Sequence, residues 1–190
     1  MIFIKNPIPG RVKTRLGKDI GHDQAVMYYK KLLEITRLAA EDATADKWLW
    51  YGDFVNEADF WSPTVFTKKL QHQGDLGERM QTAFAQAFDA GYKKVAIIGS
   101  DCPEMTSTIL EDAFAKLDNA DAVIGPANDG GYYLMAMKKP LPIFEEVDWS
   151  TESVLSQTTN HLKKHGFTYH LLKELTDLDT IEDLKHFPNL

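Results

Sequence analysis

The sequence has 190 residues, of which 44% are hydrophobic and 26% are charged, and its formal net charge is −7. This length favours one domain with a full hydrophobic core, covering residues 1–190. The acidic balance argues against a general nucleic-acid-binding protein, which would carry a broad basic face. One cysteine excludes an intramolecular disulfide and suits a reducing cytosol, and no apolar run is long enough to cross a membrane. We therefore expect a cytoplasmic protein without nucleic-acid or membrane partners.

Strand-like and helix-like segments alternate along the whole sequence. Short apolar runs predict strands at residues 1–4, 47–51, 64–70, 95–98, 121–125, 132–137 and 167–172. Apolar residues at helical spacing, or helix caps, predict helices at residues 23–43, 76–90, 108–117 and 150–165, and a short last helix after Thr180. This alternation is typical of a three-layer α/β/α fold, in which helices cover both faces of a mainly parallel sheet.

The loop after the first expected strand concentrates positive charge in an acidic protein. Its four cationic residues are Lys5, Arg11, Lys13 and Arg15. Pro9 and Gly10 make the loop tight and stiff, as a preorganised binding site requires. Ligands of open α/β sheets bind beyond the carboxyl ends of strands, and both arginine and lysine bind phosphate oxygens. We therefore expect the phosphates of a nucleotide at this loop. The alternative is a solvated basic loop.

Asp101 follows the expected central strand at residues 95–98, on a turn formed by Gly99 and Ser100. Mg²⁺ commonly takes one or two protein carboxylates together with substrate phosphates, so Asp101 is the candidate metal ligand. The turn before it would let a ligand approach closely. Alternatively, Asp101 caps the turn that follows. Cys102 is expected to be a small buried residue rather than a nucleophile, because no histidine stands near it in the sequence.

A glycine-rich segment follows the next expected strand. Gly130 and Gly131 would let the backbone approach a ligand, and Tyr132 would offer an aromatic face to a sugar. Asp129 would be a second acidic group or an acceptor for sugar hydroxyls. The Asp-Gly turn of a β-hairpin explains the same residues, and the two interpretations are compatible.

Three other acidic positions and one more loop have both a structural and a functional interpretation. Asp148 is a weaker catalytic candidate, because it stands just before residues that would cap a helix. Asp177 and Asp179 precede the last expected helix, and capping explains them at least as well as function does. The glycine-rich residues 73–79 enter a helix, where they would either meet a phosphate or a base or form only a turn.

Together, these segments resemble a bacterial family of proposed glycosyltransferases of uncharacterised function. That family belongs to the nucleotide-diphospho-sugar transferase superfamily, which has the GT-A fold. The resemblance spans almost the whole chain and rests on residues 5–16, 75–79, 99–103, 125–133, 149–151 and 177–180. It implies a nucleotide bound over the first half of the sheet and a divalent metal, Mg²⁺ or Mn²⁺, at Asp101.

The same layout is similar to the phospholactate and molybdenum-cofactor guanylyltransferases of that superfamily. They share a basic first loop, an aspartate after the central strand and a terminal Asp-x-Asp/Asn-Thr. The present sequence lacks the Gly-x-Gly-Thr/Ser-Arg loop that is usual in nucleotidyltransferases. It also lacks the Asp-x-Asp of many GT-A transferases, because Gly99 and Ser100 precede Asp101.

We expect a metal-dependent transferase that uses a nucleotide-sugar donor and an unidentified acceptor. The cations of the first loop, Lys13 among them, would neutralise charge on the departing phosphate. Asp101 would hold the metal, and Asp129 and Asp148 would serve the sugar and the acceptor. One alternative is a nucleotidyltransferase, which joins a nucleoside monophosphate to a phosphorylated acceptor and releases pyrophosphate. Another is a non-catalytic nucleotide-binding module.

Overall fold

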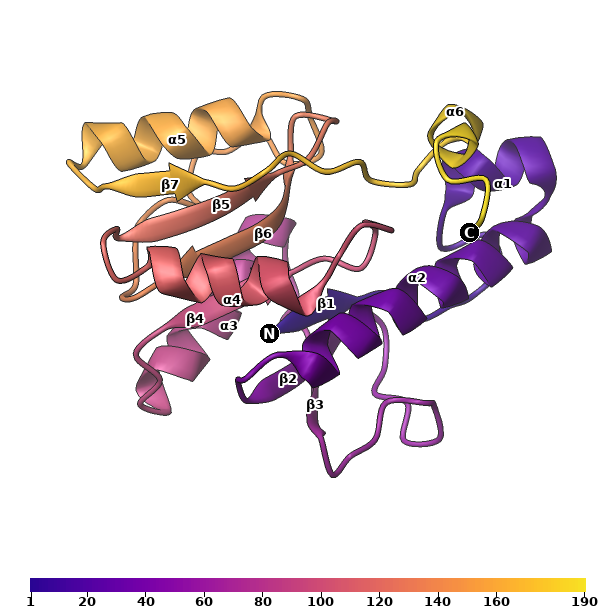
Figure 1. Cartoon of the computed structure of the whole chain (residues 1–190), viewed down its shortest axis with the longest axis horizontal. Coiled ribbons are helices and arrows are strands. Elements are labelled where there is room, and N and C mark those ends of the chain that lie inside the picture. Colours follow the sequence, from indigo (N-terminus) through magenta and orange to yellow (C-terminus); the bar gives the residue numbers. More distant parts are fainter.

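A single seven-stranded sheet forms the centre of the molecule, and helices cover both of its faces (Figure 1). The computed structural model describes all residues, 1–190. The strands are β1 (Ile2–Ile4), β2 (Lys47–Tyr51), β3 (Phe66–Leu70), β4 (Val95–Ile98), β5 (Ala122–Pro126), β6 (Tyr132–Met137) and β7 (Tyr169–Leu171). The helices are α1 (Thr14–Ile20), α2 (His22–Asp42), α3 (Leu76–Asp89), α4 (Ser107–Lys116), α5 (Val154–Lys164) and α6 (Ile181–Lys185). None of these helices has the length and apolarity needed to cross a membrane.

The strands follow the order β3-β2-β1-β4-β6-β5-β7 across the sheet. Strand β6 runs antiparallel to its neighbours β4 and β5, and every other pair of neighbouring strands is parallel. The expected three-layer α/β fold with a mainly parallel, mixed sheet is therefore confirmed.

Alternate side chains of β1 face two different cores. Ile2 and Ile4 belong to a core that they share with residues of α2 and α4, whereas Phe3 belongs to a second core shared with α3 and α5. Figure 1 shows α2 and α4 in front of the sheet and α3 behind it. All three β1 residues are buried, which explains why the strand is a continuous apolar run rather than an alternating one.

The winding of the chain reverses between β1 and β4. From β1 the chain proceeds through β2 to β3 on one side, and it then places β4 on the other side of β1. Loops that leave the carboxyl ends of two such strands separate, and ligands of open α/β sheets bind in the crevice between them. The basic residues 5–16 and the turn at residues 99–103 stand directly after these two strands.

Two helices and two strands differ by two residues or more from the sequence prediction. The sequence does not predict α1, because seven residues that include Gly17 are too few to show helical periodicity. Helix α5 begins at Val154 rather than at residue 150, because Ser150 has a left-handed backbone (φ 65°) that a right-handed helix cannot contain. Strands β3 and β7 begin at Phe66 and Tyr169, each two residues later than expected.

Candidate functional site

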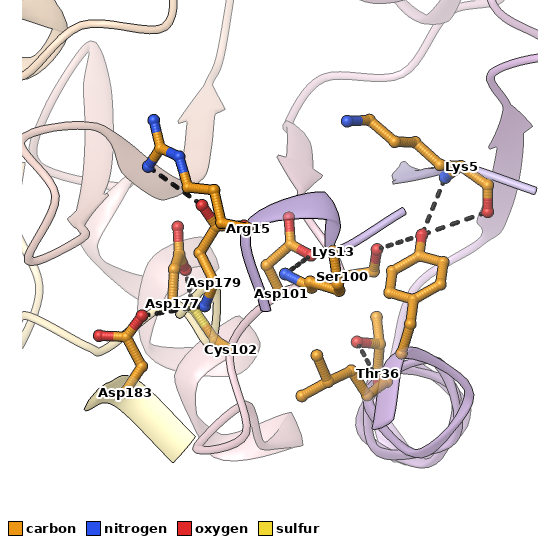
Figure 2. Close-up of polar contacts among 12 residues, drawn as sticks. Lys5, Lys13, Arg15, Thr36, Ser100, Asp101, Cys102, Asp177, Asp179 and Asp183 are labelled. Carbon is orange, nitrogen blue, oxygen red and sulfur yellow. Dashed lines mark hydrogen bonds and ion pairs between the residues drawn. The ribbon is translucent and has the colours of Figure 1, made fainter. Parts of the chain in front are cut away.

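Lys13 and Asp101 join the loops that follow β1 and β4 (Figure 2). Lys13 Nζ lies 2.5 Å from Asp101 Oδ1, and the Lys13 side chain is only 5% exposed whereas that of Asp101 is 47% exposed. Pro9 and Gly10 form the exposed turn before them, with φ 76° at Gly10. Lys13 has a left-handed backbone (φ 47°), which costs a non-glycine residue about 1–2 kcal/mol. Strain of this kind clusters at functional sites, where the surrounding structure imposes it.

Tyr29 of α2 holds the same two loops together. Its Oη accepts a hydrogen bond from Lys5 N at 2.9 Å and donates to the Lys5 carbonyl at 3.2 Å, and Ser100 Oγ lies 3.1 Å away. Burial raises the pKa of the Tyr29 phenol above its ordinary value, so the hydroxyl stays neutral. Ser100 is 3% exposed, whereas a Cβ on Gly99 would meet no atom within 4 Å. Gly99 therefore borders open space, whereas the neighbouring Ser100 is packed against the protein.

The two arginines of the first loop pair with aspartates from distant parts of the chain. Arg11 Nη2 lies 3.0 Å from Asp53 Oδ1, and Arg15 Nη1 lies 3.1 Å from Asp179 Oδ2. The Arg11 and Arg15 side chains are 60% and 72% exposed, and ion pairs this open to solvent contribute little to stability. Both arginines therefore have carboxylate partners, in ion pairs that are largely open to solvent, and phosphate binding at this loop stays a prediction.

Residues 172–180 form a C-terminal strap that returns across the carboxyl edge of the sheet. Figure 1 shows the strap as the yellow segment that runs from β7 to α6, beside α1. Leu178 N donates to the Asp101 carbonyl at 2.9 Å, and the Asp179 carbonyl accepts from the first turn of α1 at 3.1 Å. These backbone hydrogen bonds bring Asp177 and Asp179 to the loops that follow β1 and β4.

The sequence leaves the role of Asp177 open, and the structure places it inside the site. Thr180 is the residue that caps α6, since its side chain accepts from Asp183 N. Asp177 Oδ1 accepts from Cys102 Sγ at 2.7 Å. Burial, and after it the charge of Asp101, raises the pKa of Asp177 to about 6. Burial also raises the pKa of the Cys102 thiol far above its usual range, and Cys102 is a small buried residue, as the sequence predicts.

Three carboxylates share this corner of the molecule with one lysine. The charges of Asp101 and Asp129 both raise the pKa of Asp177, and Lys13 lowers it. No group of three or more His, Cys, Asp or Glu side chains is arranged to hold a metal ion by itself. Asp101 and Asp177 fit a different arrangement, in which Mg²⁺ takes one or two carboxylates and completes its shell with substrate phosphates and water.

The connection between β5 and β6 is a β-hairpin turn. Asp129 Oδ1 accepts from Gly131 N at 2.8 Å, and Gly130 has φ 86°, so the Asp-Gly turn expected from the sequence is confirmed. A Cβ on Gly130 would lie 2.2 Å from the Glu152 carbonyl oxygen. Gly130 is therefore required for contact with the segment before α5, whereas Asp129 lies close enough to Asp177 to raise its pKa.

Tyr132 and Asp148 are engaged elsewhere in the protein. The Tyr132 hydroxyl is buried without a hydrogen-bond partner, and its ring meets Trp149 edge-on with centroids 6.4 Å apart. Asp148 N donates to Gln157 Oε1, and Gln157 Nε2 donates to Asp148 Oδ2, both at 2.7 Å. No hydrogen bond joins either residue to Asp101. Their roles in binding or catalysis stay predictions.

Several solved structures share this fold. A proposed nucleotide-diphospho-sugar transferase from Desulfovibrio desulfuricans G20 is 34% identical with a TM-score of 0.88, covering 96% of this chain and 82% of that one. A cytidylyltransferase from Leptospira borgpetersenii serovar Hardjo-bovis (strain JB197) is 14% identical with a TM-score of 0.54, covering 96% and 82%. The 2-C-methyl-D-erythritol 4-phosphate cytidylyltransferase from Thermus thermophilus is 14% identical with a TM-score of 0.51, covering 82% and 85%. At 14% identity, the last two similarities show the fold alone.

A family model matches residues 35–151, which is more than half of the chain. The matched part contains Asp101 and Asp129, while the basic first loop and the C-terminal strap lie outside it. No curated protein matches the sequence. The chain therefore belongs to the family described as "uncharacterized protein conserved in bacteria" (DUF2064).

Proposed function

We propose that this protein is a glycosyltransferase that uses a nucleotide-activated sugar as its donor. The observation that carries the proposal is the contact between Lys13 and Asp101 at the reversal of winding, where open α/β sheets bind their ligands. The 34% identity to a proposed nucleotide-diphospho-sugar transferase supports this class of donor. In general terms, the protein would transfer a group from a nucleotide, and more specifically that group would be a sugar.

The cations of the first loop would bind the diphosphate of the donor. Arg11 and Arg15 are exposed and hold partly exposed carboxylates, which phosphate oxygens could replace at little cost. Lys13 is buried, so it would donate to a phosphate oxygen from a nearly fixed position. Positive charge that is in place before the reaction stabilises the negative charge that develops on the leaving diphosphate.

Asp101 and Asp177 would hold a divalent cation, Mg²⁺ or Mn²⁺. A bound cation supplies a Lewis acid for the departing diphosphate. Asp177 is mostly ionised above pH 7, although burial and the charge of Asp101 oppose its ionisation. Since Lys13 alone offsets the charges of the surrounding carboxylates, additional positive charge at Asp101 and Asp177 would relieve their repulsion.

Glycosyl transfer breaks the bond between the anomeric carbon and the diphosphate oxygen, and forms a bond from an acceptor oxygen to that carbon. The acceptor loses its proton to a base in this step. Asp129 is the better placed base, because the preceding residue, Asn128, accepts a hydrogen bond from Asp177 N and the charge of Asp129 raises the pKa of Asp177. Asp148 would first have to release Gln157. The open space at Gly99 would let the sugar approach the backbone.

Incubation of the protein with Mn²⁺ and single nucleotide sugars, followed by chromatography of the nucleotides, tests the proposal. We expect release of a nucleoside diphosphate from one donor, and loss of that release in Asp101→Asn. Lys116→Ala is the matched control, because it removes only a surface ion pair at the end of α4. Pyrophosphate release from a triphosphate and a sugar phosphate would instead establish nucleotidyl transfer. Nucleotide binding without either product would establish a binding module.

A further inference from the structure

Arg79 is the one arginine of this protein without a carboxylate partner. The other three, Arg11, Arg15 and Arg37, form ion pairs with Asp or Glu. Arg79 donates from Nε to the Asp75 carbonyl and from Nη1 to Gln71 Oε1, each at 3.1 Å. A guanidinium has five N–H donors, so three of them have no partner in the protein. Arg79 is also half-buried, and the protein around it carries a net charge of −7. The free donors of Arg79 are therefore available to an anionic ligand.

Gln71 fixes the direction of Arg79 before any ligand arrives. Gln71 is 7% exposed, and its Nε2 donates to the Ile4 carbonyl at 3.1 Å and to the Trp50 carbonyl at 3.0 Å. Because both amide hydrogens bind the ends of β1 and β2, the amide oxygen can only point toward Arg79. The guanidinium is therefore held at the carboxyl ends of these two strands.

The N-terminus of α3 does not explain this arrangement. Asp75 and Glu78 form a reciprocal capping box there, with Glu78 N donating to Asp75 Oδ1 and Asp75 N donating to Glu78 Oε2, both at 2.9 Å. A carboxylate of the protein thus already occupies the helix end. The donors that remain free belong to the Arg79 side chain.

Lys5 adds a second cation at the same edge. It directly follows Ile4, whose carbonyl oxygen Gln71 binds, and its ammonium forms no ion pair. Figure 2 shows no contact of the Lys5 ammonium with the other residues drawn. The Lys5 side chain starts beside the end of β2, since a Cβ on Gly52 would lie 4.0 Å from Lys5 Cγ. Two residues whose cations form no ion pair, Arg79 and Lys5, are therefore anchored at the carboxyl ends of β1 and β2.

We propose that Arg79, oriented by Gln71, forms with Lys5 a second oxyanion-binding subsite at the carboxyl ends of β1 and β2. A planar guanidinium binds a phosphate or a carboxylate through two parallel hydrogen bonds, and the ammonium adds a mobile point charge. This subsite is separate from Lys13 and Asp101, and it requires neither a metal nor a nucleotide. One substrate therefore carries an oxyanion in addition to the diphosphate of the donor.

Titration of the metal-free protein with inorganic phosphate tests this subsite, with the four arginine Nε–H signals followed by ¹H–¹⁵N NMR. We expect the Arg79 signal, identified by its loss in Arg79→Gln, to shift and to saturate. Arg37 is the internal control, because it is paired with Glu34 and Glu41 on α2. A parallel titration with acetate distinguishes the two sources of the oxyanion, and the anion that binds more tightly identifies the group.

Two variants separate this subsite from the proposed diphosphate site. Lys13→Ala should leave the saturation of the Arg79 signal unchanged. Arg79→Gln, with its fold checked by the same spectra, should still be titrated through the amide signals of residues 71–75. The anion affinity that these signals report should fall by about tenfold or more, as expected for a lost hydrogen bond to a charged group. If neither anion moves the Arg79 signal further than the Arg37 signal, the subsite does not exist. Because the probes are phosphate and acetate, this outcome is independent of any nucleotide donor.

Discussion

Lys13 Nζ and Asp101 Oδ1 lie 2.5 Å apart, and this contact joins the loops after β1 and β4. A donor would have to replace a contact that the protein already makes with itself. Phosphate would take the place of the carboxylate at Lys13, and positive charge from a metal would take the place of the lysine at Asp101. A phosphate alone would leave Asp101 without a positive partner, and a metal alone would leave Lys13 without a negative one. Nucleotide and metal should therefore bind more tightly together than alone.

Lys13→Ala should weaken the binding of a nucleoside diphosphate by about 1.5–3 kcal/mol, the scale of a hydrogen bond to a charged group. Binding of the matching nucleoside, which has no phosphates, should not change. Titration calorimetry with both ligands measures the difference, and Lys18→Ala on the exposed face of α1 is the control. An equal loss for the nucleoside and the diphosphate would mean that Lys13 acts on the structure and not on phosphates.

Asp177→Asn should stabilise the metal-free protein at neutral pH. The pKa of Asp177 is about 6 in the folded protein against an ordinary value of 3.8, so the folded state holds the proton more tightly. The resulting stabilisation is complete below the lower value and is lost as the pH rises through the higher one. The loss has an upper limit of about 3 kcal/mol, from 1.36 kcal/mol per pKa unit.

Asparagine cannot ionise, so the Asp177→Asn variant should escape this loss. Urea unfolding with EDTA present, at pH values from about 4 to 7.5, measures the free energy of unfolding of both proteins. The wild type should lose stability relative to the variant across this range. Parallel pH profiles for the two proteins would show that Asp177 has no raised pKa.

Tyr29→Phe should destabilise the protein by about 1–3 kcal/mol, because the partly buried Lys5 amide would lose its hydrogen-bond acceptor. Tyr28→Phe is the matched control, because it removes a hydroxyl that makes no hydrogen bond and keeps the ring that packs against the core and beneath Lys31. Chemical denaturation measures both variants. Similar stabilities for the two would mean that Tyr29 does not hold the loops after β1 and β4 together.

Gly130→Ala should lower the stability of the protein, whereas Gly99→Ala should affect only donor binding. An alanine at Gly130 would need a left-handed backbone and would place its Cβ 2.2 Å from the Glu152 carbonyl, so the free energy of unfolding should fall by more than about 1–2 kcal/mol. An alanine at Gly99 meets no atom within 4 Å, so stability should not change while donor binding weakens. Thermal unfolding and nucleotide titration separate the two effects. A stable Gly130→Ala protein would contradict the close contact with Glu152.

The sequence predicts most of this fold because the central strands are buried on both faces. Residues 95–98, for example, form a continuous apolar run, as expected for a central strand that is covered on both faces, and the structure buries all four. Short elements are harder to predict. Helix α1 has seven residues and no side-chain cap. The backbone conformations of Lys13 and Gly21 set its two ends, and Leu16 and Gly17 are buried against the rest of the protein.

The site is predicted only where it depends on the position of a strand end. Lys13 and Asp101 come after two apolar runs, so the sequence places them at the carboxyl ends of two strands. Their contact, however, depends on β4 lying next to β1, which no local pattern predicts. Asp177 depends on the path of the C-terminal strap, which no local pattern encodes. Arg79 is recognised only by elimination, once the ion pairs of the other arginines are known.

The dependence of nucleotide binding on Mn²⁺ tests the central claim most directly, namely that Lys13, Asp101 and Asp177 form a site for a nucleotide and a metal. Calorimetry on the wild type, Asp101→Asn and Asp177→Asn would compare nucleoside diphosphate binding with and without Mn²⁺. We predict that Mn²⁺ tightens binding to the wild type by about tenfold or more, equivalent to roughly 1.4 kcal/mol, and has little effect on either folded variant. Equal tightening by Mn²⁺ in all three proteins would contradict the account.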